Sequence, residues 1–346
     1  MSEGVRTRTD GSELPLGRAY DTALLDLDGV VYAGGRAIGH AVDSLAEARS
    51  GGMRLAYVTN NALRTPQAVA GHLTELGIPA ASTDVITSAQ AVARLIADEL
   101  PEGSRVLVTG GEGLRVALRE RGLVPVDSAD DDPAAVAQGY GGPDMPWSRL
   151  MEASYAVRRG VPWFASNADL TIPSGRGIAP GNGAAVEVVR IASGGAPRVA
   201  GKPQPPMHRE TVLRTGARRP LVVGDRLDTD IEGAYAGGVD SLLVLTGVTT
   251  PALLLTAEPR HRPTYVAEDL RGLLEPQPEV SVAGAGFGCG GWTASAVGGE
   301  LVLDGEGQAV DGLRALCAVA WTAAGEGSCS LEAGKALGRL GLRTLA

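Results

Sequence analysis

The chain is poor in cysteine and in long apolar runs, and each shortage excludes a class of protein. Its three cysteines among 346 residues are odd in number and lack metal-site spacing, which argues against a disulfide framework or a zinc site. They are Cys289, Cys317 and Cys329. No apolar run approaches the roughly 18 residues of a membrane span, and the polar N-terminus lacks the apolar stretch of a signal peptide. We therefore expect a reduced, cytoplasmic protein.

Acidic residues outnumber basic ones, with 40 Asp and Glu against 31 Lys and Arg. The net charge is −9 and the isoelectric point is about 5.1. Such a chain offers no basic face to nucleic acid or to an anionic membrane, so we expect neither as a partner. Hydrophobic residues make up 44% and charged residues 21%, which is typical of an ordinary globular protein. The length predicts about two domains plus a small extra piece.

Two carboxylates follow the first apolar run of the chain. Residues 23–25 indicate a short buried strand, and Asp26, Asp28 and Gly29 follow it directly. The carboxyl ends of strands are where doubly wound α/β sheets place ligands and chemistry. One carboxylate could attack phosphorus while the other moves protons. Alone the motif is weak, because a solvated turn favours the same residues.

Three later apolar runs also end in polar residues. Residues 55–61 end in Thr59 and two asparagines, and residues 199–203 lead to Lys202. Residues 221–230 end in a cluster of acids. Each run has the pattern of a buried strand that ends at its polar residues. The chain therefore presents Asp, Thr, Lys and an acid cluster in that order.

This order resembles the haloacid dehalogenase superfamily. The motifs LDLDGVVY, VTNNALRTP, AGKPQPP and VVGDRLDTDIEGA carry the resemblance. They are most similar to its class IIA phosphatases, in which a large cap lies between the second and third motifs. That class includes glycerol-3-phosphate, phosphoglycolate and p-nitrophenyl phosphatases. The resemblance implies a phosphoric monoester hydrolase.

The resemblance also implies how the acids work. Phosphate monoester hydrolysis needs accelerations of up to about 10²¹-fold, so several groups must act together. Asp26 would attack phosphorus and form an aspartyl-phosphate, while Asp28 would act as general acid and then general base. Mg²⁺ favours oxygen ligands and would offset the repulsion between carboxylate and phosphate. Its ligands would be Asp26, the backbone carbonyl of Asp28 and Asp225, with Asp230 orienting a metal-bound water.

Thr59 and Lys202 would bind the phosphoryl group. Lys202 is one of two lysines among 31 basic residues, which suggests that a compact ammonium is needed there. Thr59 would donate its hydroxyl, and the Asn60 backbone amide would help. Asn60 and Asn61 are explained equally well as turn and cap residues, and both roles can hold at once.

The alternation of strands and helices predicts a doubly wound, parallel-sheet, Rossmann-like α/β core. We assign residues 19–100 and 197–272 to this core and residues 101–196 to an inserted α/β cap. Residues 1–18 are expected to form a flexible N-terminus. Residues 273–346 are expected to form a small α+β accessory domain of unknown role.

The extension contains the pattern G-x-G-x-x-G at Gly286, Gly288 and Gly291. Because no helix follows the pattern, we expect a plain loop over residues 280–291 rather than a dinucleotide site. Beyond it we expect strands at residues 292–297 and 300–303 and helices at residues 310–323 and 331–340.

A loop of the cap is the candidate for substrate choice. By resemblance, Asn167 and Asp169 belong to its Asn-x-Asp segment. Relatives that act on pyridoxal phosphate have His near the position of Ile172, whereas those that act on glycerol 3-phosphate or phosphoglycolate have an aliphatic residue. Glycerol 3-phosphate is therefore the favoured substrate and phosphoglycolate the next, although Ile172 could equally pack the cap.

Other functions stay open. A phosphoacceptor signalling module also uses Asp, Thr and Lys, but it lacks an acid two residues after the acceptor and a cap of this length, so Asp28 favours turnover. Nucleotides and pyridoxal phosphate are alternative substrates. A homodimer through the cap or the C-terminal extension is the assembly we consider.

Overall fold

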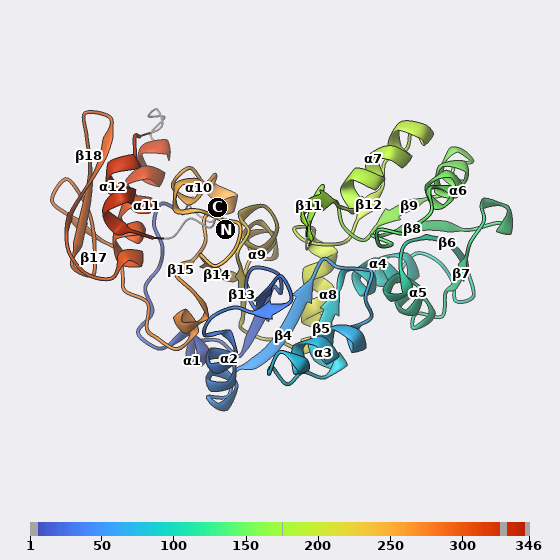
Figure 1. Ribbon diagram of the computed structural model, residues 1–346, viewed down its shortest axis with the longest axis horizontal. Helices are drawn as coiled ribbons and strands as arrows, with labels where there is room; N and C mark the ends of the chain where they lie inside the picture. The colour runs from blue at the N-terminus through green and yellow to red at the C-terminus, as the bar shows by residue number, and fades with distance from the viewer. Residues whose placement is uncertain (1–5, 175, 326–330, 343–346) are drawn as a thin grey trace. The chain divides into compact units, whose positions relative to one another are not determined.

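The chain falls into two compact units in the computed structural model (Figure 1). The structure describes residues 6–174, 176–325 and 331–342. The first unit consists of residues 1–55 and 217–346, and the second of residues 56–216. Of the three cysteines, Cys329 lies outside the described residues.

A parallel sheet lies at the centre of the first unit. Its strands, in spatial order, are β15 (Tyr265–Ala267), β14 (Asp240–Val244), β13 (Pro220–Gly224) and β1 (Thr22–Leu25). All four residues of β1 are buried, which is typical of a strand covered on both faces. Leu25 pairs with Val223, so the residues that follow β1 and β13 leave the same edge of the sheet together. The predicted parallel α/β class is confirmed.

Helices, helical turns and one short antiparallel strand pair accompany this sheet. They are α1 (Leu16–Ala19), β2 (Tyr32–Ala33), β3 (Arg36–Ala37), α2 (Ala41–Ser50), η3 (Leu227–Ile231), α9 (Glu232–Gly237), α10 (Pro251–Leu255), η4 (Pro259–His261) and η5 (Leu270–Leu273). The N-terminal segment is also attached to the unit, because the Asp10 backbone amide donates to the Thr264 carbonyl at 2.8 Å. Its flexibility remains a prediction.

The C-terminal extension forms an antiparallel sheet with two helices. Its elements are β16 (Ser281–Ala283), β17 (Gly286–Cys289), β18 (Trp292–Val297), β19 (Glu300–Gly305), α11 (Ala309–Gly325) and α12 (Gly334–Leu340). The two predicted strands and the first predicted helix are confirmed, while the second helix begins three residues later than expected. The predicted loop over residues 280–291 is wrong, since β16 and β17 pair there. A Cβ at Gly286 would lie 2.0 Å from the Ala294 carbonyl oxygen, so glycine there serves strand pairing rather than a loop.

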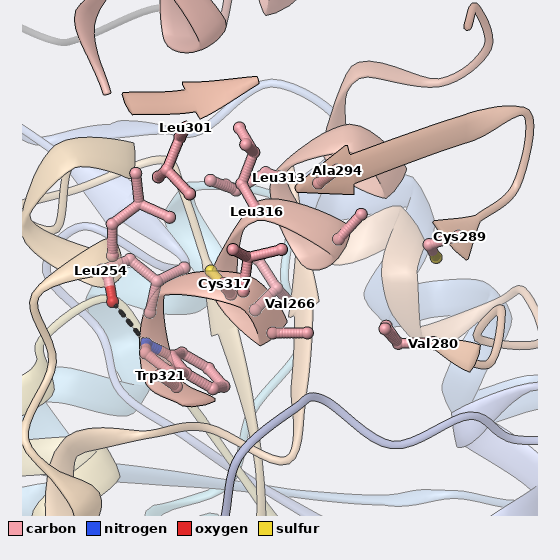
Figure 2. Close-up of a cluster of buried hydrophobic side chains, with 14 of the residues drawn as sticks. Leu254, Val266, Val280, Cys289, Ala294, Leu301, Leu313, Leu316, Cys317 and Trp321 are labelled. Atoms are coloured by element: carbon pink, nitrogen blue, oxygen red, sulfur yellow. Dashed lines mark hydrogen bonds between the residues drawn. The ribbon is translucent and has the colours of Figure 1, made fainter. Parts of the chain in front are cut away.

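The extension shares one hydrophobic core with the parallel-sheet region (Figure 2). Leu313, Leu316 and Trp321 of α11 belong to the same buried cluster as Leu254 and Val266. The indole Nε1 of Trp321 donates to the Leu254 carbonyl at 3.0 Å. Residues of the extension therefore complete the core of the first unit rather than packing only among themselves.

The second unit contains two groups of parallel strands. The chain enters it within β4 (Arg54–Thr59), which is followed by β5 (Val85–Thr87), whose register pairs Thr59 with Thr87. A separate five-stranded parallel sheet has the order β12 (Arg198–Val199), β9 (Trp163–Ala165), β8 (Ala135–Gln138), β6 (Arg105–Thr109) and β7 (Val124–Val126). Its α/β nature agrees with the expectation for the cap segment.

The remaining elements of the second unit are helices, turns and one hairpin. They are α3 (Pro66–Glu75), η1 (Ser82–Asp84), α4 (Ser88–Ala97), α5 (Glu112–Arg119), η2 (Ala129–Asp131), α6 (Trp147–Arg158), β10 (Thr171–Ser174), β11 (Gly177–Pro180), α7 (Asn182–Ser193) and α8 (Pro205–Thr215). Across the described part of the chain, no helix combines the length and the hydrophobicity that crossing a membrane requires.

Candidate active site

Three carboxylates gather at the edge of the parallel sheet in the first unit. Asp26 follows β1, Asp225 follows β13, and Asp230 lies in the π-helical turn η3. Their ligand oxygens all lie within 4.8 Å of one another, and Asp225 and Asp230 are each 1% exposed. Buried carboxylates this close repel one another, so the cluster favours a cation among them.

The surrounding backbone closes tightly around Asp225. The Val248 amide donates to its Oδ2 at 2.7 Å. A Cβ at Gly247 would lie 1.9 Å from the same oxygen, and a Cβ at Gly29 would lie 2.5 Å from it. Gly29 also has a φ of +86°, which glycine adopts without strain. An all-oxygen donor set in a cradle that admits no side chain fits Mg²⁺.

Asp28 differs from these acids in its exposure. It lies in the tight turn after β1, where the Gly29 amide donates to the Tyr32 carbonyl at 2.9 Å. Its side chain is exposed, whereas that of Asp26 is half-buried. The turn therefore separates Asp26, which belongs to the acidic cluster, from an exposed carboxylate that can exchange protons with solvent.

Thr59 and Asn61 lie at the end of β4 in the second unit. Thr59 is 5% exposed, and its Oγ1 accepts from the Asn61 amide at 3.1 Å. The Asn61 Oδ1 in turn accepts from the Leu63 amide at 2.8 Å and from the Arg64 amide at 3.3 Å. The Asn61 side chain therefore stabilises the turn that leads to α3.

Lys202 follows β12 and is held from β4. Its ammonium Nζ donates to the Val58 carbonyl at 3.2 Å. Its backbone amide donates to the Asn60 Oδ1 at 2.8 Å, and its carbonyl accepts from the Asn60 Nδ2 at 3.1 Å. One side chain thus binds both backbone groups of the lysine.

The loop that follows β9 reaches the same asparagine. The Asp169 carboxylate accepts from the Asn60 Nδ2 at 3.2 Å, and the Asn167 Nδ2 donates to the Asn60 carbonyl at 2.7 Å. The structure therefore brings Asn60, Lys202, Asn167 and Asp169 together. Ile172 instead lies in β10, where it pairs with Ala179 and is half-buried.

Sequence reasoning missed several groups that support these residues. Ser88, which is fully buried, donates its hydroxyl to the Asn60 carbonyl at 2.6 Å. Asn182 donates to the Asn167 carbonyl at 2.7 Å, and Thr246 donates to the Gly29 carbonyl at 2.6 Å. None belongs to one of the four motifs, so only the folded chain identifies them.

The fold and the acidic cluster define a class of protein, the metal-dependent α/β enzymes with an inserted second sheet. Models of known protein families narrow this class further. A haloacid dehalogenase-like hydrolase model matches residues 23–124, and a HAD-hydrolase-like model matches residues 199–273. A model of a GCN5-related N-acetyltransferase-like domain matches residues 289–342, within the C-terminal extension.

Individual relatives agree with this assignment. The chain is 46% identical over 296 residues to D-glycerol 3-phosphate phosphatase of Mycobacterium tuberculosis, covering 86% of this chain and 82% of the relative. It is 38% identical over 253 residues to acid sugar phosphatase of Staphylococcus haemolyticus, covering 72% and 94%. A crystal structure of glycerol phosphate phosphatase from M. tuberculosis in complex with magnesium superposes with a TM-score of 0.86 at 42% identity, covering 96% of this chain and 100% of that one. The chain belongs to the haloacid dehalogenase-like hydrolase family, and the predicted resemblance is confirmed.

Proposed function

We propose that this protein is a Mg²⁺-dependent phosphatase that hydrolyses glycerol 3-phosphate through an aspartyl-phosphate on Asp26. The observation that carries the proposal is the cluster of Asp26, Asp225 and Asp230, whose oxygens lie within 4.8 Å of one another. The similarity to D-glycerol 3-phosphate phosphatase over 86% of the chain supports the substrate.

Two carboxylates of the chain perform the two half-reactions. An Asp26 oxygen attacks phosphorus while the bond from phosphorus to the glycerol oxygen breaks, and Asp28 gives its proton to the departing alkoxide. Asp28 then takes a proton from the water that attacks the aspartyl-phosphate, which releases phosphate and restores Asp26. Asp26, the Asp28 carbonyl and Asp225 would hold Mg²⁺, with Asp230 orienting a metal-bound water, and the ion would supply positive charge at the phosphoryl oxygens.

The residues of the second unit bind and orient the substrate in this proposal. The Thr59 hydroxyl and the Asn60 backbone amide donate to phosphoryl oxygens, and the Lys202 ammonium offsets their charge. Asn61 stabilises the turn after Thr59. The loop that contains Asn167, Asp169 and Ile172 (the substrate loop) selects the leaving group and excludes water.

We keep the predicted domain limits as part of the proposal. Residues 19–100 with 197–272 are the catalytic core and residues 101–196 the cap. Four strands of the five-stranded sheet, β6 to β9, fall within those cap limits, which supports the division. Residues 273–346 keep an unassigned role, although their contribution to the core of the first unit argues against removing them.

We further propose that the protein is cytoplasmic and forms a homodimer, through the cap or the C-terminal extension. The free, buried thiols of Cys289 and Cys317 support a reducing compartment. Of the two candidate dimer interfaces, the cap is favoured, because it carries exposed apolar side chains on one face of α6. They are Trp147, Met151 and Tyr155, which are 64%, 44% and 44% exposed. Light scattering across a range of concentrations tests the dimer, and a monomer throughout would contradict it.

A substrate panel tests the activity. Purified protein is assayed for phosphate release from glycerol 3-phosphate, phosphoglycolate, a nucleoside monophosphate and pyridoxal phosphate, with Mg²⁺ and with EDTA. We expect kcat/KM to be highest for glycerol 3-phosphate and to vanish with EDTA. If no panel member releases phosphate in a Mg²⁺-dependent way, the proposed function is wrong.

A further inference from the structure

The Asn60 side chain makes hydrogen bonds through both ends of its carboxamide. Its Oδ1 accepts from the Lys202 amide at 2.8 Å, and its Nδ2 donates to the Lys202 carbonyl at 3.1 Å. The same Nδ2 lies 3.2 Å from both carboxylate oxygens of Asp169. One carboxamide therefore joins a lysine backbone 142 positions away to a carboxylate of the substrate loop.

The asparagine is itself fixed. Its backbone carbonyl accepts from the Ser88 hydroxyl at 2.6 Å and from the Asn167 Nδ2 at 2.7 Å. Ser88 is fully buried at the start of α4, and Asn167 is 4% exposed. Anchored in this way, the Asn60 side chain can impose its position on Lys202 and Asp169 instead of following them.

We propose that Asn60 is a positioning residue that sets the place of Lys202 and couples it to Asp169 of the substrate loop. The inference rests on the proposed function, because it gives the phosphate-binding lysine and the leaving-group loop a common support. It assigns the Asn60 side chain to internal bonds and leaves only its backbone amide for the substrate. Recognition of the leaving group by the substrate loop is thereby coupled to the position of the Lys202 ammonium.

The chemistry of the three partners requires an amide at this position. The Lys202 amide needs an acceptor, whereas the Lys202 carbonyl and the Asp169 carboxylate need a donor. Aspartate offers the acceptor but replaces the donor by an oxygen that faces two other acceptors. Asn60→Asp keeps the size of the side chain, so its effect reports the lost donor and the added charge rather than a cavity.

The kinetic test compares Asn60→Asp with a matched change elsewhere. We expect Asn60→Asp to lower kcat by about 10²-fold, since a small displacement of a positioned group costs this much. Gln67→Glu makes the same amide-to-acid change on the exposed face of α3 and should leave kcat within about twofold, as a surface change does. Thermal melting of both variants checks the fold.

Two further readouts separate positioning from a general loss of structure. The carboxyl group that N60D introduces would face the Asp169 carboxylate, and this like charge raises its pKa above the ordinary value. As the pH falls from about 8 to about 5 the group takes up a proton and regains one donor, so the kcat of N60D relative to wild type should rise. In N60D/D169N the new amide can donate to the new carboxylate, and we expect recovery of about tenfold over N60D alone. A flat pH ratio together with no recovery would overturn the inference.

A measurement independent of turnover keeps this test distinct from that of the proposed function. Hydrogen exchange of the peptide that contains Lys202 should be faster in N60D and unchanged in Q67E. If wild type is inactive on the panel but this difference appears, the proposed function fails and the link from Asn60 to Lys202 stands. If wild type is active, and N60D keeps both its kcat within about threefold and its exchange unchanged, the positioning role is wrong.

Discussion

The acids of the first unit and Lys202 of the second are held in different ways. Asp26 and Asp225 follow neighbouring parallel strands, and the pairing of Leu25 with Val223 fixes them. Lys202 depends on hydrogen bonds from Asn60. The acidic cluster is therefore built by strand register and close packing, whereas the lysine is placed by a polar network. The first should be sensitive to added volume and altered charge, and the second to the loss of a donor or acceptor.

The largest expected effect on turnover comes from Asp26→Asn. An amide is not a nucleophile, so kcat should fall by at least about 10⁴-fold. The change also removes one of three carboxylates that lie within 4.8 Å of one another, so the metal-free variant should melt at a higher temperature than metal-free wild type. Kinetics with Mg²⁺ and melting in EDTA measure the two effects. Turnover above about 1% of wild type would contradict the nucleophile assignment.

Lys202→Ala should have the next largest effect. Removing the charge at the phosphoryl group should cost about 3 to 4 kcal/mol of barrier, by analogy with oxyanion donors. Lys202→Arg should recover only part of kcat, because the planar guanidinium has a different shape and hydrogen-bonding geometry. The other lysine provides the control: Lys335 is 85% exposed and paired with Glu300, so Lys335→Ala should leave kcat unchanged. An arginine variant as active as wild type would show that charge alone is required.

The sequence predicted the acidic cluster better than the network around Lys202. Asp26 and Asp225 each follow an apolar run, and parallel strands bring such ends to one edge of the sheet. The position of each acid can therefore be predicted from the strand that precedes it. The hydrogen bonds from Asn60 to the Lys202 backbone join distant positions of the chain. The sequence alone does not show which backbone groups an asparagine side chain will bind.

The extension illustrates another limit of sequence reasoning. Glycines at positions 286 and 288 favour a loop by composition, yet both lie in β17, where the missing side chain of Gly286 lets the neighbouring strand approach. Trp321 gave no sign that it would contact Leu254. The strands β18 and β19 and the helix α11 were predictable from the sequence pattern, whereas β16, β17 and the packing of the extension against the core of the first unit were not.

Gly247→Ala tests whether packing sets the acidic cluster. The new methyl group would lie 1.9 Å from the Asp225 Oδ2 and must displace it, so Mg²⁺ affinity should fall by about 10- to 100-fold. Raising the Mg²⁺ concentration should restore much of kcat. Gly71→Ala is the matched control, because nothing lies within 4 Å of a Cβ there. As a helix-interior change in α3, it should raise stability by about 0.5 to 1 kcal/mol. Equal Mg²⁺ affinity in both variants would argue against the packed cradle.

Glu210 should show the smallest effect on turnover and a clear effect on stability. Its side chain is fully buried in α8 and forms ion pairs with Arg94, Arg121 and Arg214. Burial alone would raise the pKa of Glu210, but the hydrogen bonds and charges of Arg94 and Arg214 outweigh it and lower the pKa. Glu210→Gln should leave kcat unchanged and reduce the free energy of unfolding by about 1.5 to 3 kcal/mol at neutral pH.

The pH dependence of this loss distinguishes an ionic contribution from one of shape. A carboxylate whose pKa is lowered on folding stabilises the protein above its unfolded pKa, near 4.5, and loses this contribution as the pH falls through the folded value. The difference in unfolding free energy between wild type and E210Q should therefore be constant near neutral pH and shrink below about pH 4.5. Glu187→Gln, which breaks an exposed pair with Arg190, should cost at most about 0.5 kcal/mol. If the difference in unfolding free energy between wild type and E210Q stays constant down to acid pH, Glu210 acts through packing. Its negative charge would then not be what compensates the three arginines.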